Sequence, residues 1–61
     1  MLNRLDVFTF FVWVNNKWVE DEPGMLGFDN ACQFMTDLHI KNLVCETDHG
    51  LIYKIERREI L

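Results

Sequence analysis

The longest apolar run of the chain lies near its beginning. Residues 6–14, DVFTFFVWV, are rich in Val, Phe, Thr and Trp, the residues that suit the pleated, half-buried surface of a strand. Asn15 and Asn16 follow, and asparagine tolerates the positive φ that both central residues of a type I′ turn require. The pattern therefore predicts a hairpin whose second strand covers residues 17–21.

A two-residue turn determines which residues of this hairpin face each other. It sets Trp13 opposite Trp18 and Phe11 opposite Glu20, and opposed residues share one face of a sheet. The other face then receives the apolar residues that alternate with these, namely Phe8, Phe10, Val12, Val14 and Val19. Because the first strand is apolar on both faces, we expect it to be internal in the sheet, with the second strand at an edge.

A helical period follows Glu-Pro-Gly at residues 22–24, which is expected to end the second strand. Four apolar residues then recur at the spacing of one helix face, Ala31, Phe34, Met35 and Leu38. Asp29 suits the N-cap, and Asn42 suits a left-handed residue beyond the C-terminal end. We expect a helix over residues 30–39 whose apolar stripe packs on the sheet.

The last third of the chain predicts a second hairpin, with strands at residues 43–47 and 51–57. In a three-residue loop between them, Gly50 can supply the positive φ. That loop pairs Cys45 with Tyr53 on the face toward the helix. The opposite face then carries Val44, Glu46, Ile52 and Lys54.

The resulting order is ββαββ. We expect a small α+β domain covering residues 1–61, with one helix packed on a mainly antiparallel four-stranded sheet in two layers. The expected core consists of Phe8, Phe10, Val12, Phe34, Leu38, Tyr53 and Ile55. A chain of this length buries only about 60% of the surface that its unfolded form exposes, so its stability is marginal.

Charge weakens the case for nucleic acid as a ligand. The net charge is -4 with a pI near 4.9, which opposes attraction to a phosphate backbone. The acidic run at residues 20–22 is expected to form a solvated loop. Lys54, Arg57 and Arg58 form a basic cluster that lies among glutamates, and we expect it at a solvated strand end.

Cysteine and histidine supply four candidate zinc ligands, Cys32, His39, Cys45 and His49. Cys32 and His39 are separated by a rise of about 10.5 Å along one helix, which is too far for a shared ion. We therefore expect no metal and no other cofactor. A disulfide between Cys32 and Cys45 would suit the geometry, but reduced core thiols are the preferred interpretation for a chain in a reducing compartment.

No catalytic arrangement is evident, and we expect a protein that is not an enzyme. The chain contains no serine, and a nucleophilic pair of Cys45 and His49 would need a cleft that so short a chain can hardly enclose. The apolar run is preceded by Asp6 and is far shorter than the roughly 20 residues that span a membrane. We expect a cytoplasmic protein of a bacterial or host cell.

The face away from the helix is the candidate site, because it should carry polar residues and instead carries aromatic ones. Its expected binding residues are Phe11, Trp13, Trp18, Glu20, Val44, Glu46 and Ile52. The favoured hypothesis is a stand-alone protein-binding module, an inhibitor or anti-defence type protein of phage or bacterial origin, whose partner has a basic or mixed surface. The alternatives are a homodimeric regulatory or structural subunit, and a nucleic-acid-binding module that uses the same aromatic residues.

Overall fold

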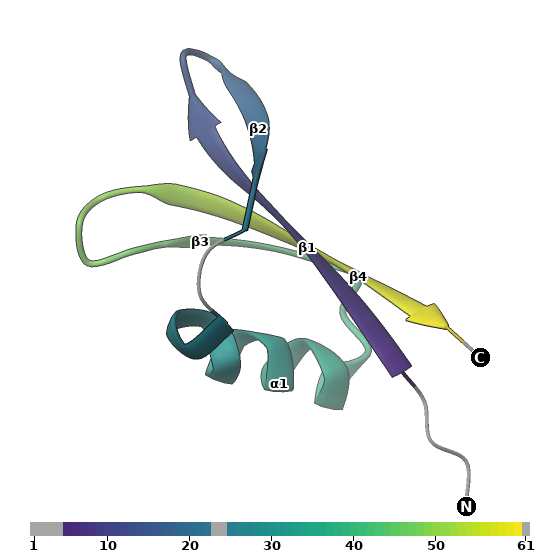
Figure 1. The fold of residues 1–61 in the computed structure, drawn as a ribbon. Coiled ribbons are helices and arrows are strands. Elements are labelled where there is room, and N and C mark those ends of the chain that lie inside the picture. Colours follow the sequence, from purple (N-terminus) through teal and green to yellow (C-terminus); the bar gives the residue numbers. More distant parts are fainter. Residues whose placement is uncertain (1–4, 23–24, 61) are drawn as a thin grey trace, which may run out of the picture.

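The computed structural model describes residues 5–22 and 25–60 and has two layers, a four-stranded sheet and a helix beneath it (Figure 1). The elements in chain order are β1 Leu5–Val14, β2 Lys17–Asp21, the 3-10 turn η1 Met25–Phe28, α1 Asp29–Leu38, β3 Asn42–Glu46 and β4 Ile52–Ile60. The strands are arranged in the order β2-β1-β4-β3, and every neighbouring pair is antiparallel. The predicted ββαββ fold is confirmed.

The first hairpin has the predicted register. Trp13 pairs with Trp18 and Phe11 pairs with Glu20. Asn15 and Asn16 adopt φ values of 52° and 62°, as a turn with two left-handed residues requires. β1 lies between β2 and β4, so its internal position and the edge position of β2 are both confirmed. Pro23 and Gly24, which were expected to end the second strand, lie outside the described residues.

The second hairpin also closes as predicted, with Cys45 opposite Tyr53. Gly50 has a φ of 84°, and the Thr47 backbone N–H donates to the Leu51 carbonyl at 2.8 Å across the loop. β4 extends beyond the expected strand end, to Ile60, because its last residues pair with the beginning of β1.

The ends of α1 differ from the prediction. Asp29 is the first helical residue and not the N-cap, a position occupied by Phe28 without a side-chain hydrogen bond. The left-handed residue at the other end is His39, with a φ of 56°, and not Asn42. Asn42 is unsuited to that role because it begins β3 and is extended. The helix is therefore followed almost at once by the second hairpin.

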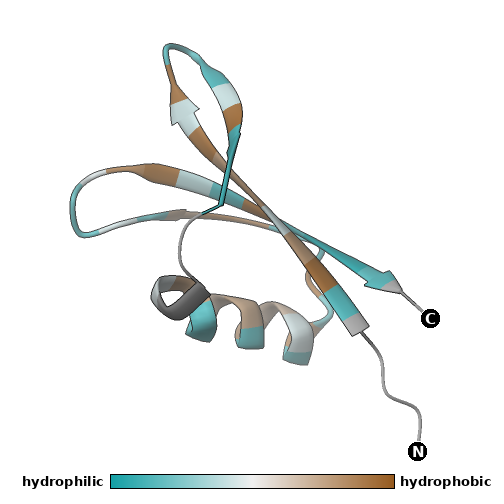
Figure 2. Cartoon of the chain, in the orientation of Figure 1, coloured by the Kyte–Doolittle hydropathy of each residue, from teal (hydrophilic) through white to brown (hydrophobic). Residues whose placement is uncertain are grey.

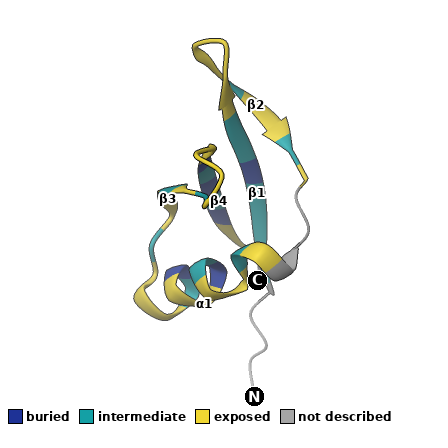
Figure 3. Ribbon diagram, turned by 90° about the vertical axis from the view of Figure 1, so that its left-hand side faces the viewer, coloured by how far each residue is buried: buried dark blue, intermediate teal, exposed yellow. Residues whose placement is uncertain are grey.

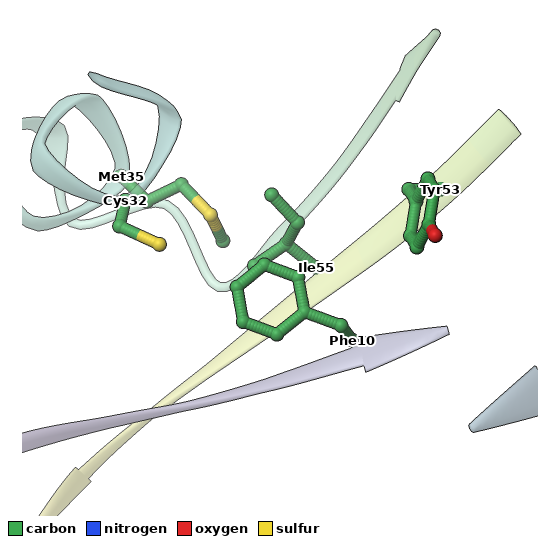
Figure 4. Packing of buried hydrophobic residues seen from close by; sticks show 5 residues of the cluster. All are labelled: Phe10, Cys32, Met35, Tyr53 and Ile55. Atoms are coloured by element: carbon green, nitrogen blue, oxygen red, sulfur yellow. The ribbon is translucent and has the colours of Figure 1, made fainter. Parts of the chain in front are cut away.

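Five buried residues form the core between α1 and the sheet: Phe10, Cys32, Met35, Tyr53 and Ile55 (Figure 4). Phe8 and Val12, which were expected in the core, are partly buried and pack against it. Figure 3 shows the buried part of α1 on the side turned toward the strands.

The orientation predicted for the helix is confirmed for Ala31 and Met35, which pack on the core, and is wrong for the other two residues of the stripe. Phe34 is 49% exposed and Leu38 is 58% exposed, whereas both were expected in the core. The physical reason is η1, which packs Phe28 against the rings of Phe10 and Tyr53, with centroids 5.3 and 5.0 Å apart. An aromatic ring just before α1 thus packs on the helix side of the sheet, where the prediction had placed the larger side chains of the helix.

Arg57 corrects a second expectation, since it is buried, with 6% of its surface exposed, instead of solvated. Its Nε donates to the Ile40 carbonyl at 2.9 Å, and its Nη1 donates to Asp6 Oδ2 at 3.2 Å and to Glu59 Oε1 at 3.0 Å. Burial disfavours the charged guanidinium, but the hydrogen bonds and charges of Glu59 and Asp6 outweigh it and raise the pKa of Arg57. Arg58 is exposed, as expected.

Candidate interaction surface

All seven predicted binding residues lie on the sheet face opposite α1. Phe11 pairs with both Glu20 and Lys54, and Lys54 pairs in turn with Val44, so the four strands present these side chains together. We call this surface the open face and define it by Phe11, Trp13, Trp18, Glu20, Val44, Glu46, Ile52 and Lys54. Phe10, Tyr53 and Ile55 of the core alternate with them along β1 and β4 and lie on the other side of the sheet.

The aromatic side chains of the open face contact one another. Trp13 and Trp18 form an edge-to-face pair with ring centroids 5.0 Å apart and planes inclined by 67°. The Lys54 ammonium lies 4.8 Å from the ring centroid of Phe11 and 5.1 Å from that of Trp18, within reach of cation–π attraction. Trp13 remains 42% exposed, so this cluster is ordered and still accessible.

Lys54 is the member of the open face that the expected binding residues did not include. Its contact with Phe11 depends on the pairing of β1 with β4. These two strands belong to different hairpins, so no turn in the sequence indicates that they are neighbours. The apolar stretch at the start of β1 indicated an internal strand, but it did not identify the neighbour.

Aliphatic side chains continue the apolar surface toward β3. Val44 is 59% exposed and Ile52 is 39% exposed. The tip of the β1–β2 hairpin projects away from α1 (Figure 1), and β1 is apolar along most of its length (Figure 2). Exposed apolar side chains are thus present on the open face from the Trp13–Trp18 pair to the edge strand β3.

Acidic residues flank this apolar surface. Glu20 on β2 and Glu46 on β3 belong to the two edge strands of the sheet and are exposed. Within residues 5–22 and 25–60, neither carboxylate takes part in an ion pair. Both are therefore available to cations of a partner.

The two thiols and the histidines do not form a metal centre. In the part of the chain that the structure describes, no three His, Cys, Asp or Glu side chains lie close enough to hold an ion. Cys32 and Cys45 are free thiols, and burial raises the pKa of each. Cys45 and His49 line one hollow of about 450 Å³, but the raised pKa keeps Cys45 in the thiol form, which is a poor nucleophile.

Comparison with known proteins gives no relative from which a role could be transferred. No protein-family model, curated protein or solved structure matches this chain. Among the described residues, no helix has the length and apolar character needed to cross a membrane.

Proposed function

We propose that the chain is a small protein-binding module that acts by covering a surface of a partner protein with its open face. The observation that carries the proposal is an accessible aromatic cluster around Trp13 on the side of the sheet that α1 leaves uncovered. Exposed apolar patches with polar rims are typical of interaction sites, and tryptophan is enriched among residues that dominate binding energy. The pairing of Trp13 with Trp18 holds the rings in place before binding, which lowers the entropic cost.

The charged rim indicates the chemistry of the partner. Glu20 and Glu46 favour a protein with exposed Arg or Lys opposite the two edge strands, and association with it should slow as salt screens the attraction. The same carboxylates oppose a nucleic-acid backbone, although Lys54 lies over two aromatic rings.

A role as an inhibitor, the anti-defence type of phage or bacteria included, is our more specific proposal. Such a protein needs only to occupy its target, and a rigid apolar face on a short chain suits that task. The free thiols Cys32 and Cys45 agree with a reducing, cytoplasmic location.

A homodimeric subunit is the second candidate. β3 carries Glu46 at one end of the open face and is preceded by Lys41 at its other end. A second copy placed face to face and reversed along the strands would oppose these two charges. Molecular mass in solution separates the two candidates, because only self-association raises it with concentration.

The test of the open face compares three variants that are first shown to be folded. Trp13→Ala and Val44→Lys change the open face, and Leu38→Ala changes an exposed residue of α1. We expect Trp13→Ala to weaken binding to the partner protein, or self-association, by at least about 2 kcal/mol. Val44→Lys should also weaken it, whereas Leu38→Ala should have no effect. Unchanged binding by both open-face variants would contradict the proposal.

A further inference from the structure

A hollow of about 360 Å³ lies beyond Lys54, at the end of the sheet face away from the tryptophan pair. It is lined by Thr9, Lys41, Asn42, Glu56, Arg57 and Arg58. Glu56 pairs with Thr9 on one side and with Asn42 on the other, so these three residues form a row across β1, β4 and β3 on the same side as the open face. A neighbouring hollow of about 330 Å³ shares Lys41, Arg57 and Arg58 with it and is also lined by Glu59.

Two of the cations at this hollow are uncompensated. Arg57 lies between two carboxylates, those of Asp6 and Glu59, and Glu56 forms an ion pair with Lys54 at 3.5 Å. The side chains of Lys41 and Arg58 are exposed and make no ion pair or hydrogen bond with any other described residue. These two cations outweigh the one carboxylate in excess beside Arg57, so the hollow is locally positive in a chain with a net charge of -4.

The lining suits a carboxylate better than a polyanion. Arg58 offers a planar fork of donors that matches a carboxylate, and the Thr9 hydroxyl and Asn42 amide can donate further hydrogen bonds. Glu56 lies in the same lining, and Glu20 and Glu46 lie on the same side of the sheet, so an extended phosphate backbone would meet repulsion from these carboxylates.

We propose that this hollow binds a single carboxylate, the side chain of an Asp or Glu on the protein that covers the open face. The inference rests on the proposed function and specifies the partner. That partner has a mixed surface, with apolar and basic groups opposite Trp13 and the acidic rim, and an acidic group opposite Lys41 and Arg58.

The experiment is a titration of the isotope-labelled protein with acetyl-Asp-Glu-amide at constant ionic strength, followed by backbone amide NMR. We expect shifts at Thr9, Asn42 and Arg58 that saturate, and no shifts with the neutral analogue acetyl-Asn-Gln-amide. Lys41→Gln and Arg58→Gln should each weaken binding by about two- to five-fold, the range for exposed ion pairs. Lys17→Gln removes the same charge at the tip of the first hairpin and should leave binding unchanged.

Equal shifts with the neutral peptide, or equal weakening by Lys17→Gln, would overturn the inference. Saturation by inorganic phosphate or by a single-stranded oligonucleotide, without saturation by the acidic peptide, would overturn it as well. Failure here is distinguishable from failure of the proposed function. If the acidic peptide does not bind while Trp13→Ala abolishes partner binding, the carboxylate site is refuted and the open face remains the interaction surface.

Discussion

Arg57 joins three parts of the fold through one side chain. It links β4 to Asp6 on β1 and to the Ile40 carbonyl after α1, and Thr36 Oγ1 donates to the same Asp6 oxygen at 3.1 Å. The other oxygen of that carboxylate, Asp6 Oδ1, is buried and has no hydrogen-bond partner among the described residues. Loss of the guanidinium would therefore leave a buried carboxylate with little compensation.

We predict that Arg57→Gln lowers the free energy of unfolding much more than Arg58→Gln does. The two arginines are adjacent on β4, but only Arg57 is buried among acidic partners, and Arg58→Gln should change stability by no more than about 0.5 kcal/mol. Urea denaturation of both variants measures the difference. Equal losses would show that the Asp6 contact contributes nothing to stability.

Three acids with raised pKa values predict loss of stability at alkaline pH. Burial raises the pKa of Cys32 and Cys45 above 9.0, and a hydrogen bond to Asp21 Oδ2, together with burial, raises the pKa of Tyr53 above 10.0. The unfolded chain loses these protons first, so the stabilisation is complete below about pH 9 and declines as pH rises toward the folded-state pKa values. The thermal midpoint should therefore decrease as the pH is raised from about 8.5 to about 10.5. A midpoint that stays constant over this range would refute the prediction.

At the scale of elements, the hairpins were predictable because their signals are local. Asn15 and Asn16 define one turn and Gly50 defines the other, and each turn determines a register. The rotation of α1 was not predictable in the same way. Two apolar stripes that share Ala31 and Met35 run along the helix, one with Phe34 and Leu38 and the other with Cys32. Phe28, which lies before the helix, favours the stripe with Cys32 by packing on the sheet.

The rotation of α1 leads to a stability prediction for two helical residues. Met35 is fully buried, so Met35→Ala should lower the free energy of unfolding by about 2 to 5 kcal/mol. Leu38 is mostly exposed, and Leu38→Ala should cost no more than about 0.5 kcal/mol. Chemical denaturation of both variants makes the comparison. A larger loss for Leu38→Ala than for Met35→Ala would contradict this orientation and support the predicted one, in which Leu38 is buried.

At the scale of the whole molecule, the two faces of the sheet have different roles. One α-helix covers the core face among the described residues, and the open face keeps an ordered aromatic cluster in contact with solvent. The sequence was sufficient to group Trp13, Trp18 and Val44, since each hairpin defines its own faces. The strand order β2-β1-β4-β3 was not predicted, and Lys54 over Phe11 and the hollow near Arg58 both depend on it.

The most direct test of the open face as the interaction surface is a residue-resolved footprint. Amide and indole signals of the labelled protein would be compared between the free state and the complex, or between low and high concentration if the chain associates with itself. We predict changes centred on Phe11, Trp13, Trp18 and Val44, with the signals of Phe34 and Leu38 on α1 unchanged. A footprint centred on those two helical residues, with the tryptophan indole signals unmoved, would contradict the account.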